Sequence, residues 1–182
     1  MGWRRVTLDG DALFQPGGLS IDLNGIAKGF GVDEAARALD RAGVRSYLVE
    51  VGGELRGTGA KPDGQPWWVE LERPPVASAN DEASPRTLLA LHGLSVATSG
   101  DYRRFFDHAG KRYAHTLDPA SGLPCDAGVG SVTVLHPECM TADALATALT
   151  VMGPDTAIAF ATARDLPALV VTRGANGLSE RL

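Results

Sequence analysis

Short runs of residues with strand-like patterns follow one another at hairpin spacing along this chain, and they outnumber the helical runs. Residues 5–8 and 12–14 flank a turn signal at Asp9-Gly10-Asp11, which is typical of a β-hairpin. Hairpins join antiparallel strands, so this order predicts an α+β fold, a mainly antiparallel sheet with helices packed on it. Further strands are expected at residues 46–52, 67–73, 87–99, 101–107, 112–117, 131–136 and 168–172.

Helical patterns occur in three stretches. Apolar side chains recur at helical spacing over residues 27–42. Further helices are expected over residues 140–152, with Thr141 as the N-cap, and over about 155–164. Residues 74–86 are polar and rich in Pro, Ala and Ser, and we interpret them as a surface loop within one domain because the strand pattern resumes after them.

Composition limits the class of protein. With 182 residues, 44% of them hydrophobic, the chain is long enough to bury a normal core as one soluble domain over residues 1–182. Its two cysteines are too few for a disulfide framework. The formal net charge is −5 and no run of Lys or Arg occurs, so we expect no nucleic-acid partner.

The sequence shows no pattern of membrane targeting. Residues 1–10 lack the apolar run of about 7–15 residues that a secretion signal needs. Apolar stretches elsewhere are interrupted by charge or glycine well short of the ~20 residues that cross a bilayer. As written, the sequence therefore predicts a cytoplasmic protein with no membrane span.

An acid, a turn and a lysine stand at the start of the first expected helix. Asp22 is followed by Asn24-Gly25, and Lys28 lies inside the first helical turn. Exposed backbone amides at a helix start, together with a cation, can hold a phosphate. The segment is neither a Walker A loop nor a Gly-x-Gly-x-x-Gly fingerprint. Taken alone, a lysine such as Lys28 is more often a solvated surface charge.

Asp143 and Thr147 are four residues apart in the helix expected at 140–152, so their side chains stack on one face. A carboxylate and a hydroxyl are hard oxygen ligands of the kind that Mg²⁺ prefers. The alternative is structural: Asp143 would favour the positive end of its own helix, and Thr147 would bond back to the helix backbone.

Hydroxyls, acids and one histidine gather around the turns at residues 98–101 and 115–122. The ordinary pKa of histidine, near 6.5, suits His115 as a general acid or as a phosphate contact. A single histidine in a strand is usually structural. No two histidines stand at a metal-ligand spacing, and the two cysteines form no Cys-x-x-Cys pattern.

Four blocks of this sequence occur in the same order in a known family. They are Ile21-Asp-Leu-Asn-Gly-Ile-Ala-Lys-Gly-Phe-Gly-Val-Asp33, Val51-Gly-Gly-Glu54, Ala97-Thr-Ser-Gly100 with His115-Thr-Leu-Asp-Pro-x-x-Gly122, and Met140-Thr-Ala-Asp-Ala-Leu-Ala-Thr-Ala-Leu149. On these blocks the chain resembles the FAD:protein FMN transferase family, the flavin transferases called ApbE. Residues 1–182 are expected to be the C-terminal portion of the usual family domain.

This resemblance implies a flavin site on an α+β fold, with Mg²⁺ on the pyrophosphate of FAD. The implied contacts of the flavin nucleotide are Asp22, Lys28, Gly52, Gly53, His115 and Leu117, and the implied metal ligands are Asp143, Thr147 and a backbone carbonyl from Gly25 to Ala27. Gly52 and Gly53 fit a place where backbone approaches the ligand closely. As general base, His115 is the first candidate by residue type and Asp143 is the second.

The implied reaction moves FMN from FAD to a Ser or Thr hydroxyl of an acceptor protein and releases AMP. Mg²⁺ would neutralise the pyrophosphate and the developing charge, and Lys28 would add a second cation. Two alternatives stay open: hydrolysis of the FAD pyrophosphate at the same metal site, and a shortened, non-catalytic domain that only binds flavin or nucleotide.

Family members usually carry a longer region before the first block, including much of the wall that holds the isoalloxazine ring. They are often exported to the periplasm or the membrane surface. In this chain Asp22 arrives almost at once. We therefore expect the chain alone to bind FAD weakly and to discriminate poorly between FAD and ADP, because an apolar pocket normally buries most of such a ring.

Overall fold

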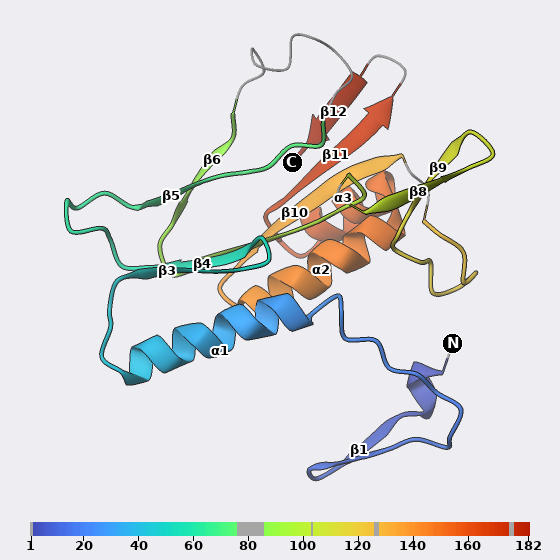
Figure 1. Cartoon of the computed structure of the whole chain (residues 1–182), viewed down its shortest axis with the longest axis horizontal. Helices are drawn as coiled ribbons and strands as arrows, with labels where there is room; N and C mark the ends of the chain where they lie inside the picture. The colour runs from blue at the N-terminus through green and yellow to red at the C-terminus, as the bar shows by residue number, and fades with distance from the viewer. Residues whose placement is uncertain (1, 76–85, 103, 126–127, 175–176) are drawn as a thin grey trace.

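A computed structural model describes residues 2–75, 86–102, 104–125, 128–174 and 177–182. Its main element is a six-stranded sheet in the order β12-β11-β10-β7-β4-β3, in which all neighbouring strands are antiparallel (Figure 1). The strands are β3 (Tyr47–Val51), β4 (Glu54–Thr58), β7 (Leu94–Gly100), β10 (Val129–His136), β11 (Ala168–Gly174) and β12 (Gly177–Arg181). The expected α+β fold with a mainly antiparallel sheet is confirmed.

Helices pack on one face of this sheet. They are α1 (Ala27–Arg41), α2 (Cys139–Met152) and α3 (Pro154–Thr162). α2 lies against β7 and β10, α1 contacts α2, β3 and β4, and α3 contacts α2 and β11 (Figure 1). Val132 and Val134, which alternate along β10, point to this face and pack with the small residues Ala142 and Ala146 of α2. The main core therefore lies between α2 and the middle of the sheet.

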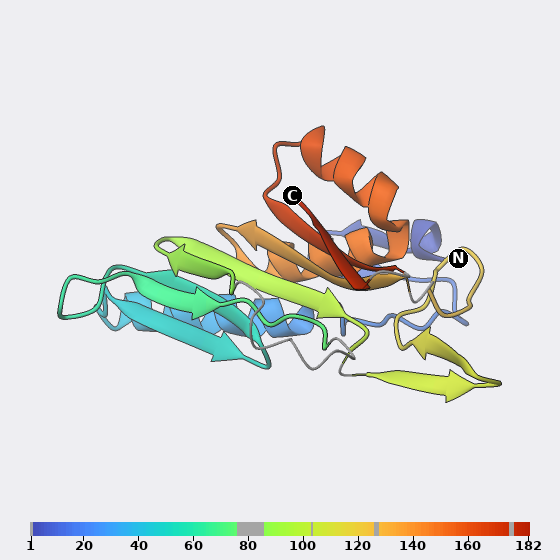
Figure 2. The same cartoon turned by 90° about the horizontal axis from the view of Figure 1, so that it is seen from above.

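Ribbons of two strands complete the fold. They are β1 (Thr7–Asp9) with β2 (Ala12–Phe14), β5 (Trp67–Glu70) with β6 (Leu88–Leu91), and β8 (Phe105–His108) with β9 (Lys111–Ala114); a short 3₁₀ turn, η1 (Trp3–Arg5), precedes them. The β5–β6 ribbon packs Leu91 on Val96 of β7. Val96 and Ala97 are adjacent, so the pleat directs them to opposite faces, and the ribbon covers the face away from α2. Figure 2 shows the β8–β9 ribbon extending beyond the sheet.

The strands expected from the sequence are confirmed with some differences. The segment 87–99 folds as two strands, because His92-Gly93 makes a turn in which Gly93 adopts a φ of +69°. β9 ends at Ala114, so His115 lies beyond the strand. β4 and β12 were not expected. The loop expected at 74–86 falls mostly outside the described residues.

Thr141 was the wrong choice for the N-cap of α2. The helix begins two residues earlier, at Cys139, after Glu138. Thr141 donates its hydroxyl to the Glu138 side chain at 2.9 Å, and the backbone N–H of Cys139 bonds to Asp33 of α1. A cap supplied by another helix cannot be read from the residues around the helix start. Among the described residues, no helix has the length and apolarity that crossing a membrane requires.

Candidate functional site

α1 and α2 run antiparallel in very close contact, and glycines on α1 and just before it make this possible. A Cβ on Gly29 would lie 2.4 Å from the carbonyl oxygen of Cys139 and 2.7 Å from the Cα of Met140, both of them backbone atoms that cannot rotate away. Gly25, just before α1, contacts the side chain of Thr147, which lies in the C-terminal half of α2. Any side chain at residue 29 would therefore push the helices apart.

Asp143 of α2 caps the N-terminus of α1. Ile26 precedes α1 and its side chain has no hydrogen-bonding group, but the Gly29 N–H donates to Asp143 Oδ2 at 3.0 Å. Asp143 is 5% exposed. Burial raises the pKa of its carboxyl, against the opposing effects of the Gly29 N–H and of the Lys28 charge. The cap uses Oδ2 of this carboxylate.

Asp33 of α1 in turn caps the N-terminus of α2. Its Oδ1 accepts the Cys139 N–H at 3.0 Å and its Oδ2 accepts the Met140 N–H at 2.9 Å. The guanidinium of Arg56, on β4, donates to Oδ1 at 2.8 Å. Asp33 is 1% exposed, and these bonds satisfy a carboxylate that would otherwise be costly to bury.

Lys28 projects from the first turn of α1 to a buried acid of the sheet. Its Nζ lies 2.5 Å from Oε1 of Glu54, whose side chain is 1% exposed, whereas that of Lys28 is 43% exposed. Burial raises the pKa of the Glu54 carboxyl, Lys28 opposes this, and the nearby Asp143 charge adds to it. Among the described residues Glu54 Oε2 has no hydrogen-bond partner. Lys28 is thus oriented by Glu54 and still open to solvent.

The turn at Gly52-Gly53 brings Glu54 to this place. Both glycines have positive φ, +61° and +99°, which other residues rarely adopt. A Cβ on Gly52 would lie 3.1 Å from Cδ of Lys28, so backbone and lysine stem are in close contact. Glu54 ends one of the four family blocks, but no role was expected for it from the sequence. The sequence feature that could have indicated a role for Glu54 is its position directly after the Gly52-Gly53 turn.

The structure therefore brings together five of the residues singled out from the sequence. Gly25, Lys28, Gly52, Asp143 and Thr147 lie around the N-terminus of α1, through the contacts described above. Gly53 adjoins this group in the β3–β4 turn, and Ala27 is the first residue of α1. We call these residues, together with Glu54, the α1 cluster.

Three other candidate residues lie in different segments. Asp22 is exposed, and its Oδ1 accepts the Asn24 N–H at 2.8 Å in a turn before α1. His115 is exposed after β9, with Nδ1 2.9 Å from the carbonyl oxygen of Arg104. Leu117 is exposed in the loop that follows. Within the described ranges, no hydrogen bond or ion pair joins these three to the α1 cluster.

The oxygen atoms of the α1 cluster suit a hard cation. A carboxylate (Asp143), a hydroxyl (Thr147) and the backbone carbonyls just before α1 are ligand types that Mg²⁺ accepts. In the described part of the chain, no three His, Cys, Asp or Glu side chains gather as a metal site. Glu54, the other carboxylate of the cluster, is paired with Lys28. A cation held beside Asp143 would therefore depend on the hydroxyl and carbonyl oxygens as well as on the Asp143 carboxylate.

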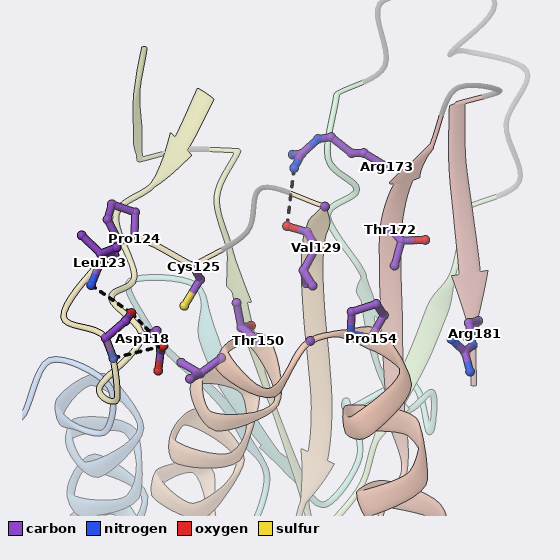
Figure 3. A pocket seen from close by; sticks show the side chains of 14 residues that line it. Asp118, Leu123, Pro124, Cys125, Val129, Thr150, Pro154, Thr172, Arg173 and Arg181 are labelled. Carbon is purple, nitrogen blue, oxygen red and sulfur yellow. Dashed lines mark hydrogen bonds between the residues drawn. The ribbon is translucent and has the colours of Figure 1, made fainter. Parts of the chain in front are cut away.

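A separate pocket of about 520 Å³ lies at the C-terminal end of α2 (Figure 3). Its wall includes the loop after Leu117, where Asp118 accepts hydrogen bonds from Ala120 and Ser121. These hydrogen bonds lower the pKa of the Asp118 carboxyl, and the bond from the Ala120 N–H has the largest effect. None of the α1 cluster lines this pocket, so the two features are distinct.

Comparison with known proteins gives consistent matches. The ApbE family model matches residues 1–170. The FAD:protein FMN transferase of Vibrio cholerae is 42% identical over 180 residues, which are 98% of this chain and 53% of that protein. The FAD:protein FMN transferase of Haemophilus influenzae is 41% identical over 157 residues, 86% of this chain and 44% of that protein. The chain thus spans about half the length of these relatives.

Solved structures agree. The apo form of the Pseudomonas stutzeri flavinyl transferase ApbE superposes with a TM-score of 0.86 at 40% identity, covering 98% of this chain and 54% of that one. The ApbE protein of Thermotoga maritima superposes with a TM-score of 0.80 at 35% identity, covering 99% of this chain and 57% of that one.

Proposed function

This chain belongs to the ApbE family, and on that premise we propose that it transfers FMN from FAD to a Ser or Thr hydroxyl of an acceptor protein, in an Mg²⁺-dependent reaction that releases AMP. The observation that carries the proposal is the α1 cluster: a lysine, a buried carboxylate and a hydroxyl meet at one helix N-terminus. A pyrophosphate needs cations and N–H donors, and this is where the chain offers both.

In this proposal Mg²⁺ is held by Asp143, by Thr147 and by a backbone carbonyl from Gly25 to Ala27. The close approach of Thr147 to Gly25 supports this set of metal ligands. Thr147 Oγ1 lies 3.4 Å from the position that a Cβ on Gly25 would occupy, so the hydroxyl lies beside the backbone of Gly25. Mg²⁺ bound there supplies the charge that neutralises the pyrophosphate. The Gly29 N–H fixes the Asp143 carboxylate, so the ligand is preorganised.

Lys28 is assigned to a phosphate oxygen. The Lys28 side chain is 43% exposed, and its ion pair with Glu54 restricts the conformations it adopts. The backbone N–H of Lys28, in the first turn of α1, adds partial positive charge at the same place, whereas the Ala27 N–H already donates to the Leu23 carbonyl oxygen at 2.9 Å. Asp22, Gly52, Gly53, His115 and Leu117 are assigned to further contacts with the nucleotide.

His115 is proposed as the general base that takes the proton of the acceptor hydroxyl. A carbonyl oxygen can only accept a hydrogen bond, so the 2.9 Å contact with Arg104 places the proton of neutral His115 on Nδ1. The other ring nitrogen, Nε2, is then unprotonated and can accept a proton. Asp143 is the second candidate, and it is less suited because its oxygens are already assigned to Gly29 and to the metal.

The products formed from FAD test the proposal against its two alternatives. The chain is incubated with FAD, Mg²⁺ and Ser/Thr-containing acceptor peptides, with a parallel sample in EDTA. AMP together with a covalently fluorescent peptide supports transfer. AMP together with free FMN indicates hydrolysis, and no AMP in either sample indicates a domain that only binds nucleotide. The proposal also requires that EDTA abolish product formation.

A further inference from the structure

Each of the helices α1 and α2 is capped by an aspartate of the other. Asp143 accepts the Gly29 N–H of α1, and Asp33 accepts the N–H groups of Cys139 and Met140 of α2. A helix is ordinarily capped by the residue just before it. Two caps exchanged between helices tie the two N-termini to each other.

These caps also fix the register of the two helices. Gly29 and Asp33 are about one turn apart on α1, and Cys139 and Asp143 are about one turn apart on α2. The two links therefore bracket a single turn of antiparallel contact. Sliding one helix along the other by one residue moves it by about 1.5 Å, which is enough to break both links.

β4 holds the same arrangement from the sheet side. Glu54 and Arg56 are two residues apart on this strand, so both side chains point to the face against which α1 packs. Glu54 binds Lys28, and Arg56 binds Asp33. One strand thus orients both the proposed phosphate-binding lysine and the aspartate that caps α2.

We propose that Asp33 is a positioning residue of this site: it anchors α2 so that Asp143 stays bonded to Gly29 and presents its second oxygen to the metal. Asp33 touches neither substrate nor metal and acts through Asp143. The inference rests on the proposed function for the identity of the metal, whereas the placement of Asp143 rests on the hydrogen bonds alone.

The variant Asp33→Asn tests this, because the amide keeps the size of the side chain but removes its charge and one acceptor. Asp40→Asn is the matched control: Asp40 is also on α1, but it bonds to the Tyr47 hydroxyl of β3 and not to α2. The first readout is amide hydrogen exchange by NMR at Gly29, relative to Val32 and Ala36 in the same helix. The second is the Kd for Mn²⁺, measured by EPR of the free ion.

We expect Asp33→Asn to speed exchange at Gly29 by about tenfold relative to Val32 and Ala36, which corresponds to about 1.4 kcal/mol. The Kd for Mn²⁺ should rise by a similar factor, and Asp40→Asn should change neither. A purely structural role would speed exchange at all three amides together. Equal exchange ratios in Asp33→Asn and wild type would therefore overturn the proposal.

The metal readout separates this inference from the proposed function. If the wild-type chain binds no Mn²⁺ while Gly29 responds to Asp33→Asn, the positioning role stands and the proposed metal site fails. Should Asp33→Asn not fold, Arg56→Gln is measured instead, since it weakens the hold on Asp33 and leaves the carboxylate in place. Faster exchange at Gly29 alone supports the proposal in that variant, and an unchanged ratio refutes it.

Discussion

Replacing Gly29 by alanine tests the close contact of α1 and α2 on which the site depends. The new Cβ would meet the Cys139 carbonyl oxygen at 2.4 Å, and ordinary van der Waals contact begins near 3.4 Å. The helices must therefore separate by about 1 Å at this point. The 3.0 Å bond from the Gly29 N–H to Asp143 would stretch out of hydrogen-bonding range.

The expected cost follows from these two effects. Overpacking of a tight core contact costs about 1–3 kcal/mol, and loss of a hydrogen bond to a charged group costs about 1.5–3 kcal/mol. Alanine is a better helix former than glycine, which offsets about 0.5–1 kcal/mol of this loss of stability. We expect Gly29→Ala to lower the free energy of unfolding by about 2–4 kcal/mol, or the Tm by roughly 5–15 °C.

Gly31→Ala is the matched control on the same helix. The nearest atom to a Cβ there is Cγ1 of Val51, at 3.9 Å, so alanine fits without strain. This variant should be stabilised by about 0.5–1 kcal/mol in urea denaturation. Equal stability of Gly29→Ala and Gly31→Ala would refute the reasoning, because the two substitutions differ only in what the new methyl group meets.

Three further outcomes are expected. Burial raises the pKa of the Cys139 thiol to about 12, so iodoacetamide at pH 8 should modify this residue only after denaturation. Mass spectrometry of digests measures the modification. Rapid labelling of the native protein at Cys139 would contradict this prediction. Asp101→Asn should lower the free energy of unfolding in urea by about 3 kcal/mol, because it removes the carboxylate that binds Arg173 at 2.6–2.7 Å. Adding Arg173→Met should recover most of this loss. Unchanged stability of the single variant Asp101→Asn would contradict the prediction. In a ¹³C NMR titration, the pKa of the Asp118 carboxyl should lie below its ordinary value of 3.8. Its stabilising contribution is then present above pH 3.8 and is lost as the pH falls through the lowered pKa. A titration midpoint above 3.8 would contradict the hydrogen bonds at this turn.

The sequence predicted the parts of the site that depend on local spacing. Asp143 and Thr147 are on one helix as expected, and Lys28 lies in the first turn of another. Neither residue spacing nor helix periodicity could indicate that Asp143 caps α1 and not its own helix. That contact joins residues 114 positions apart, and only the packing of α1 on α2 creates it.

The missed strands have polar or small residues where a strand pattern requires apolar ones. The buried positions of β4 are Glu54 and Gly57, which carry no hydrophobic signal. β12 is an edge strand with mostly exposed residues, so neither face is marked by alternation. Both strands form because neighbouring strands supply their hydrogen bonds, which is information outside the segments themselves.

Thr147→Val offers the most direct test of the claim that α1 and α2 form a metal-dependent transfer site. Valine keeps the shape of the side chain and removes only the hydroxyl that stands beside Gly25. Thr141→Val is the control on the same helix, since that hydroxyl bonds to Glu138. The measurement is the rate of AMP release from FAD at increasing Mg²⁺ concentration. Thr147→Val should need at least about tenfold more Mg²⁺ for half-maximal rate, as loss of about 1.4 kcal/mol implies, while Thr141→Val matches wild type. Identical Mg²⁺ dependence in all three proteins would contradict the metal site.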